Sequence, residues 1–209
     1  MSINTDRAAL LLIDPQVDFL SPSSVVWDVI GEEVERVGVL DKLVRLRRAA
    51  VEVGVPIFYS PHYYADHEYD QWGHLNPLDE LMFSRRMFDS SLPGSEFHPD
   101  LLPDDSVIVL SPHKCLSGFW TADLALQFRQ RDIQTIILAG MAANLCLESH
   151  LRDAIENGFD VLVVGDATAG PGRAATDAAQ VNFGLIASAV MTTDDVVAQL
   201  GAQIPALHS

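Results

Sequence analysis

The chain has 209 residues, 48% of them hydrophobic, and a formal net charge of −16 at pH 7. This length fits one domain with a full core, and the charge excludes nucleic acid and anionic membrane surfaces as expected partners, because both require a basic patch. No apolar run reaches the roughly 18–20 residues of a membrane helix, and no signal-peptide pattern begins the chain, so we expect a cytoplasmic protein.

Short apolar runs alternate with amphipathic runs along the chain. The apolar runs predict strands at residues 8–13, 56–60, 106–110, 135–139, 160–164 and 187–191. The amphipathic runs predict helices at residues 32–53, 121–131, 145–157, 174–183 and 193–200. Continuous apolar strands separated by helices indicate a parallel sheet covered on both faces, so an α/β fold is expected.

Residues 61–103 interrupt this alternation. The segment is rich in His, Tyr, Trp, Pro and Asp and has little periodicity. Since long loops in compact domains are often functional, we expect it to pass over the edge of the sheet that carries the active site. No repeat, linker or low-complexity tract is visible, so residues 1–209 are expected to form a single domain.

Three chemically distinct side chains follow predicted strands: Asp14 after the first, Lys114 after the third and Cys146 after the fourth. Parallel sheets bind ligands outside the carboxyl ends of their strands, so these residues can act as base, electrostatic activator and nucleophile. Each also has an ordinary structural explanation. Asp14 precedes Pro15 and can cap a turn, Lys114 can be a solvated loop residue, and a single cysteine is often a small buried hydrophobe.

Cys146 lies near the start of the predicted helix at residues 145–157. Unpaired N–H groups and the helix dipole favour a thiolate at that position, and a neighbouring Lys114 would add to the effect. We therefore expect an ionised Cys146. The second cysteine, Cys115, is expected to be a packed free thiol, because two cysteines make no disulfide framework.

Three segments resemble the isochorismatase-like cysteine hydrolases, a superfamily that includes nicotinamidases, carbamoylsarcosine amidohydrolases and isochorismatases. DPQVDFL, beginning at Asp14, resembles the motif D-x-Q-x-D-F. HKCLSGFWTADLALQF is similar to the block K-x-x-x-S-x-F-x-x-T-x-L, and AGMAANLCLESHLRDAIENG to G-x-x-T-x-x-C-V-x-x-T-x-R-D-A. The resemblance extends over about residues 8–193. Ala143, Leu147 and Ser149 depart from the third motif without affecting the three candidate residues.

The resemblance implies a three-layer α/β/α sandwich with a Rossmann-like six-stranded parallel sheet. It also implies an Asp14–Lys114–Cys146 triad and a cis peptide bond between Met141 and Ala142. The backbone N–H groups of Ala142 and Cys146 would form the oxyanion hole. A homo-oligomer, either a dimer or a tetramer, is expected from the same resemblance.

Pocket residues are less clearly marked. Apolar and aromatic side chains line most small-molecule sites, so the candidate wall residues are Phe19, His62, Trp72, Phe119 and Trp120. Nicotinamidases typically carry an acidic metal ligand where this chain has Ser60. The candidate ligands that remain are His62, Asp66, His67 and His74, but their spacing is not that of a known site, so neither a metal nor another cofactor is expected.

These observations favour a cysteine-dependent hydrolase that cleaves an amide or related C–N bond of a small molecule through a thioester. One alternative is an isochorismatase, which hydrolyses a vinyl ether to 2,3-dihydro-2,3-dihydroxybenzoate and pyruvate and needs no nucleophile. Another is a non-catalytic scaffold that retains the fold. The presence of Cys146 favours the first interpretation over the second.

Overall fold

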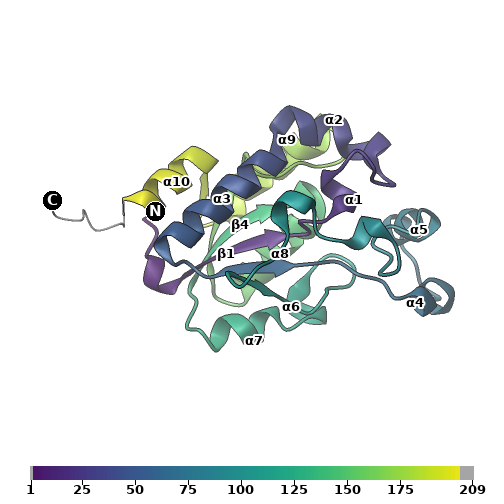
Figure 1. Ribbon diagram of the computed structural model, residues 1–209, viewed down its shortest axis with the longest axis horizontal. Coiled ribbons are helices and arrows are strands. Elements are labelled where there is room, and N and C mark those ends of the chain that lie inside the picture. The colour runs from purple at the N-terminus through teal and green to yellow at the C-terminus, as the bar shows by residue number, and fades with distance from the viewer. Residues whose placement is uncertain (1, 203–209) are drawn as a thin grey trace.

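The computed structural model describes residues 2–202 and is built around one six-stranded parallel sheet (Figure 1). The strands are β1 (Ala8–Ile13), β2 (Ile57–Ser60), β3 (Val107–Val109), β4 (Thr135–Gly140), β5 (Asp160–Val164) and β6 (Ala189–Met191). Their order across the sheet is β3-β2-β1-β4-β5-β6, and all neighbouring pairs are parallel. The expected α/β class and Rossmann-like sheet are confirmed.

The strand order reverses between β1 and β4, which lie side by side with Ile13 opposite Gly140. In open parallel sheets, ligands bind outside the carboxyl ends of the strands at such a reversal point. Asp14 follows β1, and the turn that carries Cys146 follows β4. The topology therefore brings these two chain segments to the same crevice.

Helices cover both faces of the sheet, as expected for strands that are buried on both sides. The longer ones are α2 (Trp27–Val37), α3 (Val39–Val53), α8 (Glu148–Glu156), α9 (Arg173–Ile186) and α10 (Thr193–Gly201). The shorter ones are α1 (Val17–Leu20), α4 (Asp66–Gln71), α5 (Pro77–Ser84), α6 (Gly118–Thr121) and α7 (Leu124–Arg129). None of the helices in residues 2–202 has the length and hydropathy that a bilayer crossing requires.

The alternation of β1 side chains divides the core in two. Leu10 and Leu12 belong to a cluster with residues of α2, α3 and α10, whereas Leu11 and Ile13 belong to a cluster with residues of α7, α8 and α9. In Figure 1, α3 and α10 lie above the sheet and α7 below it. This is the three-layer arrangement that the resemblance implies.

The predicted helix at residues 32–53 is interrupted in the structure. Gly38 has φ 69° and ψ 44°, a left-handed conformation that ends α2 and immediately precedes α3. Glycine adopts this conformation without steric cost, so it permits a sharp change of direction between two helices. The prediction located the helical segment but missed its division and the first turns of α2.

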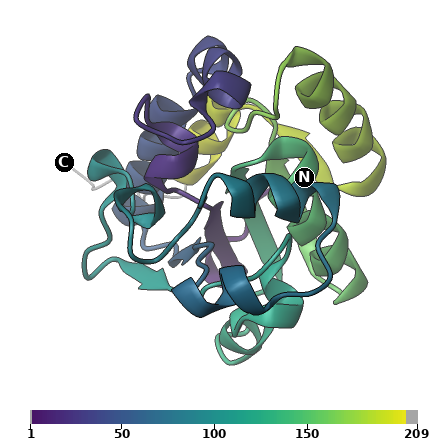
Figure 2. The ribbon, with the colours of Figure 1, turned by 90° about the vertical axis from the view of Figure 1, so that its right-hand side faces the viewer.

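Residues 61–103 are more structured than the expected loop. They contain α4, α5 and two 3-10 turns, Pro93–Ser95 and Pro99–Leu101. Asn76 accepts hydrogen bonds from the N–H groups of Leu78 and Asp79, which caps α5 at its N-terminus. Figure 2, which faces the carboxyl edge of the sheet, shows α4 and α5 in front of it. The segment therefore covers the side of the sheet on which the candidate residues lie.

Candidate functional site

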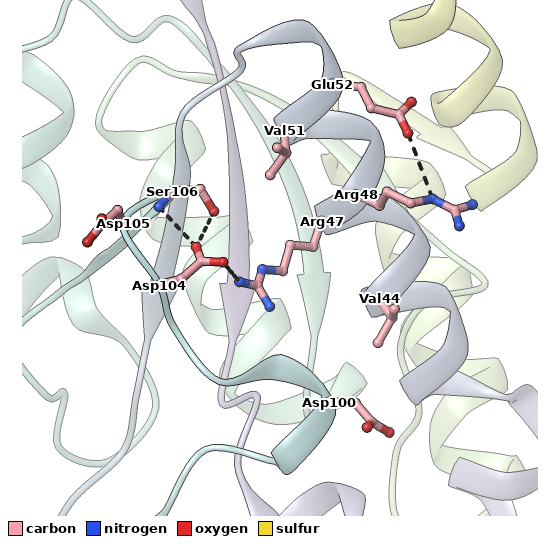
Figure 3. Close-up of a pocket in the computed structure, with 9 residues that line it drawn as sticks. All are labelled: Val44, Arg47, Arg48, Val51, Glu52, Asp100, Asp104, Asp105 and Ser106. Atoms are coloured by element: carbon pink, nitrogen blue, oxygen red, sulfur yellow. Dashed lines mark hydrogen bonds and ion pairs between the residues drawn. The ribbon is translucent and has the colours of Figure 1, made fainter.

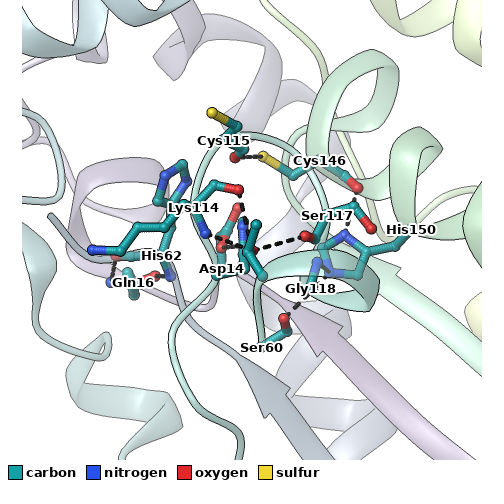
Figure 4. Close-up of polar contacts among 12 residues, drawn as sticks. Asp14, Gln16, Ser60, His62, Lys114, Cys115, Ser117, Gly118, Cys146 and His150 are labelled. Carbon is teal, nitrogen blue, oxygen red and sulfur yellow. Dashed lines mark hydrogen bonds and ion pairs between the residues drawn. The ribbon is translucent and has the colours of Figure 1, made fainter. Parts of the chain in front are cut away.

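Asp14 and Cys146 meet at the reversal point of the sheet (Figure 4). Asp14 is fully buried and has φ 48°, a conformation that Asp tolerates better than most residues. Gly140 permits the close approach of the two strand ends, because a Cβ atom there would lie 2.2 Å from the carbonyl oxygen of Ile13. Cys146 lies in the distorted helical turn Ala143–Leu147, which connects β4 to α8.

The environment of Cys146 keeps its thiol neutral. Burial is the main cause that raises the pKa of Cys146 well above its ordinary value, and the nearby Asp14 carboxylate raises it further. The backbone N–H groups of Ala142 and Cys146 lower the same pKa by a smaller amount. The expectation of an ionised Cys146 is therefore wrong, since desolvation and the adjacent carboxylate outweigh the turn's N–H groups. The Met141–Ala142 peptide bond is cis.

Lys114 is directed toward α4. Its ammonium group donates hydrogen bonds to the Glu68 carboxylate at 2.5 Å and to the carbonyl oxygen of Tyr63 at 2.7 Å. The side chain that contacts Asp14 is that of the preceding residue, His113, with 2.8 Å between its Nε2 and Asp14 Oδ1. The structure thus brings Asp14 and Cys146 together, but it pairs Asp14 with a histidine.

Sequence reasoning missed His113, although the motif contained the signal. In K-x-x-x-S-x-F, the first residue precedes the serine by four positions. His113 precedes Ser117 by four positions, whereas Lys114 precedes it by three. The spacing therefore assigns the lysine position of the motif to His113, in agreement with its contact with Asp14.

His62 lies deep in the same site and is held there through its backbone. Gln16, from the first motif, accepts a hydrogen bond from the His62 N–H at 2.8 Å and donates to the His62 carbonyl at 3.0 Å. The His62 ring stacks on Phe88 and lies 4.5 Å from the His113 ring, measured between centroids. Burial, followed by the charges of nearby groups including His113, lowers the pKa of His62 well below its ordinary value, so its imidazole is neutral.

His150 was also missed, and it supports the backbone of Cys146. Its Nε2 accepts a hydrogen bond from the Gly118 N–H at 2.9 Å, so the ring proton resides on Nδ1. Nδ1 can then donate to the carbonyl oxygen of Cys146 at 2.7 Å. Burial lowers the pKa of His150 to about 3, which keeps this tautomer neutral. The sequence did contain a signal for His150: it follows Cys146 by four residues, and residues four apart lie on the same face of a helix.

An apolar cavity of about 80 Å³ opens beside the Cys146 thiol. Phe19 and Leu145 line it together with residues of α2 and α5. Every described residue that lines this cavity is apolar or, in the case of Cys146, an uncharged thiol. The cavity therefore suits a small apolar group close to the sulfur.

The other predicted wall residues lie elsewhere. Trp120 is 79% exposed on α6, and Phe119 packs below the sheet against His150 and Phe159. Trp72 packs against Tyr64 and Phe83. Of the five predicted pocket residues, the structure brings Phe19 to the cavity and His62 to the buried polar cluster.

The segment over the site is anchored by two buried carboxylates. Asp18 accepts a hydrogen bond from the Phe88 N–H at 2.7 Å, and burial raises the pKa of Asp18 above its ordinary value. Burial alone would also raise the pKa of Asp89, but hydrogen bonds from Ser91 and the ion pair with Arg86 hold it below its ordinary value. The first motif and residues 86–91 are thus joined by polar contacts in the protein interior.

A larger hollow, about 710 Å³, lies at the opposite edge of the sheet (Figure 3). It is formed by α3 and by residues 100–106, which precede β3. Four of its charged side chains form two ion pairs, Arg47 with Asp104 at 2.8 Å and Arg48 with Glu52 at 4.0 Å. Since neither cysteine lines this hollow, the small cavity at Cys146 is the better candidate active site.

Comparisons with known proteins identify the family of the chain. Residues 8–195 match the family model described as the isochorismatase domain. Ureidoacrylate amidohydrolase RutB of Methylorubrum extorquens (strain DSM 6343 / CIP 106787 / DM4) is 25% identical over 190 residues, which cover 82% of this chain and 74% of that protein.

Two solved structures show the same fold. A cysteine hydrolase from Pseudomonas syringae pv. phaseolicola 1448A has a TM-score of 0.84 and 22% identity, with 97% of this chain and 96% of that chain covered. Nicotinamidase PncA from Bacillus subtilis has a TM-score of 0.71 and 22% identity, with 88% of this chain and 99% of that chain covered.

Proposed function

The chain belongs to the isochorismatase family, and from this premise we propose that it hydrolyses a C–N bond of a small carboxamide or ureido compound, with Cys146 as the nucleophile. One observation carries the proposal: the buried Cys146 sulfur and a buried Asp14 carboxylate oxygen lie within 4.8 Å of each other, and two backbone N–H groups interact with the sulfur. A nucleophile, its proton acceptor and an oxyanion site are thus available together.

In the first half of the reaction, the neutral thiol loses its proton to the Asp14 carboxylate as sulfur attacks the substrate carbonyl carbon. The carbonyl π bond breaks, and its electron pair forms an oxyanion. The backbone N–H groups of Ala142 and Cys146 stabilise this oxyanion, and one such donor is typically worth about 3 kcal/mol. Because the thiol pKa is raised, proton transfer to Asp14 accompanies attack and does not precede it.

In the second half, protonated Asp14 donates its proton to the departing amine as the C–N bond breaks, which leaves a thioester on Cys146. Asp14 then removes a proton from water, which attacks the thioester. Breakdown of that intermediate releases the acid, and the thiol recovers its proton from Asp14. Asp14 therefore acts alternately as base and acid, as general acid–base catalysis requires.

His113 takes the supporting position that sequence reasoning assigned to Lys114. Its contact with Asp14 Oδ1 orients the carboxylate toward Cys146 and supplies a hydrogen bond to its charged form. The Lys114 ammonium is held by Glu68 and the Tyr63 carbonyl, so its positive charge acts on the site only from a longer distance. In this scheme Asp14 and Cys146 perform the chemistry and His113 positions Asp14.

The cavity favours a neutral substrate. Because its described walls are apolar, no cation is available there to pair with a carboxylate on the substrate. This argues for a small amide or ureido compound with an apolar group, and it argues against isochorismate, which is a dianion. The named activity of the relative, ureidoacrylate amidohydrolase, supports C–N bond cleavage as the reaction class.

The test is ammonia release from a panel of primary amides and ureido compounds. The panel includes matched pairs, such as butyramide and succinamate, which differ in whether one end is a methyl group or a carboxylate. We expect the neutral member of each pair to be hydrolysed faster. Pyruvate release from isochorismate would instead support vinyl ether hydrolysis, and no turnover on either class would support the scaffold alternative.

The chain provides a matched control for the nucleophile. Cys146→Ala should lower kcat by about 1000-fold or more, whereas Cys115→Ala makes the same chemical change in the other thiol and should retain most activity. Wild-type turnover by Cys146→Ala would refute covalent catalysis.

A further inference from the structure

Four side chains that could hold a metal ion converge at the site: Asp14, His62, His113 and Cys146. Each follows a different strand of the sheet, from β1 to β4. One ligand atom from each residue lies within 4.8 Å of the others, and all four residues are buried. The cluster lacks Asp66, His67 and His74, the metal candidates that the sequence suggested beside His62.

Several polar atoms of this cluster have no hydrogen-bond partner. Both ring nitrogens of His62 are buried and unpartnered, as are Oδ2 of Asp14 and Nδ1 of His113. A buried polar atom without a partner costs about 1–3 kcal/mol, so several in one place require an explanation. Gln16 holds the His62 backbone in position, and neither ring nitrogen of His62 has a protein partner, so the imidazole is available to a ligand.

We propose that Asp14, His62, His113 and Cys146 form a binding site for a divalent transition-metal ion of the zinc class. Two imidazoles, one carboxylate and the Cys146 sulfur, whose proton is released to solvent as the ion binds, suit a borderline-soft cation such as Zn²⁺. Mg²⁺ and Ca²⁺ prefer oxygen ligands. Ligands of a tetrahedral zinc at about 2.0–2.3 Å lie about 3.3–3.8 Å from each other. The ligand atoms lie within 4.8 Å of one another, so binding requires the most distant of them to approach by about 1 Å.

Metal binding has a consequence that rests on the proposed function. An ion held by all four side chains engages both the sulfur that attacks the substrate and the carboxylate that accepts its proton. Four protein ligands also fill a tetrahedral shell, which leaves no position for a metal-activated water. The metal-bound form is therefore inactive in the cysteine mechanism, and removal of the ion restores activity.

The test uses metal alone, without substrate. Protein treated with a chelator and desalted is titrated with ZnCl₂ by calorimetry and with CoCl₂ by absorption spectroscopy. We expect one ion per chain, intense visible bands typical of tetrahedral cobalt, and a near-ultraviolet thiolate-to-cobalt charge-transfer band. Absence of binding, or an octahedral spectrum without the sulfur band, overturns the proposal.

Two matched pairs of variants assign the ligands. His62→Ala should weaken Zn²⁺ binding by at least ~100-fold, while His67→Ala, an exposed histidine on α4, should leave the affinity within about twofold. Cys146→Ala should abolish the charge-transfer band, while Cys115→Ala should retain it. Thermal melting of each variant shows whether it folds, and His62→Gln replaces His62→Ala if that variant is unfolded. Equal loss of affinity in His62→Ala and His67→Ala, or a charge-transfer band that persists in Cys146→Ala, overturns the proposal.

Failure of this inference is distinguishable from failure of the proposed function. Binding is measured without turnover, and hydrolysis by chelator-treated protein is measured without metal. Metal binding by a protein that hydrolyses no amide contradicts only the proposed function. Hydrolysis by a protein that binds no metal contradicts only the metal site.

Discussion

Gln16 offers a direct test of how the buried site is held together. Its side chain is fully buried and forms three hydrogen bonds to backbone groups: with the His62 N–H at 2.8 Å, the His62 carbonyl at 3.0 Å and the Ser95 carbonyl at 2.6 Å. Gln16→Met removes all three bonds but preserves nearly the same volume. At about 1 kcal/mol net for each bond, we expect the free energy of unfolding to fall by about 3 kcal/mol.

The assay is urea unfolding at neutral pH, followed by thermal melting. For a chain of this size, a loss of about 3 kcal/mol lowers Tm by about 6–12 °C. Gln130→Met is the control, because Gln130 is exposed and its substitution should change stability by less than about 0.5 kcal/mol. A loss below about 1 kcal/mol in Gln16→Met would refute the conclusion that these three bonds fix His62.

Three further predictions test the surroundings of the site. Gly94→Ala should destabilise the fold by about 1–3 kcal/mol, because the new Cβ would lie 2.2 Å from Asp18 Oδ1. Chemical unfolding measures this loss, and an unchanged free energy of unfolding would contradict the close packing at Gly94. Asp89 has a lowered pKa in the folded state, so its contribution to stability is present above the ordinary carboxyl pKa and is lost as pH falls through the lowered value. Asp89→Asn should therefore cost about 1–3 kcal/mol at neutral pH and flatten the acid side of the stability profile, and an unchanged profile would refute this assignment. His113→Ala should lower kcat/KM by about 100-fold, and Lys114→Ala should lower it by less. A larger loss in Lys114→Ala than in His113→Ala would instead support Lys114 as the third member of the triad.

Much of the fold could be predicted because local pattern and topology agree. The apolar runs at residues 8–13 and 160–164 match β1 and β5 at both ends, and the other four strands differ from their predictions by one or two residues at the ends. Buried parallel strands produce continuous apolar runs that are easily recognised. Short helices such as α4 and α5 contain too few turns to establish a helical period, so the sequence pattern predicted a loop where they lie.

The candidate site was predicted in position but only partly in chemistry. Asp14 and Cys146 were located correctly at the reversal point because strand ends can be counted from the sequence. His113 and Lys114 are neighbours in an irregular segment, so a shift of one residue decides which of the two side chains faces Asp14. The raised pKa of Cys146 could not be anticipated, since desolvation depends on every group packed around the sulfur.

Each of four consecutive strands is followed by a connection that supplies one side chain of the site. This arrangement affects how the protein can change by mutation. Asp14, His62, His113 and Cys146 reach a common centre from four separate connections, and the sheet beneath fixes where each connection begins. A mutation in one connection can exchange one functional group while the other three keep their places. Such a scaffold allows its chemistry to diversify one position at a time.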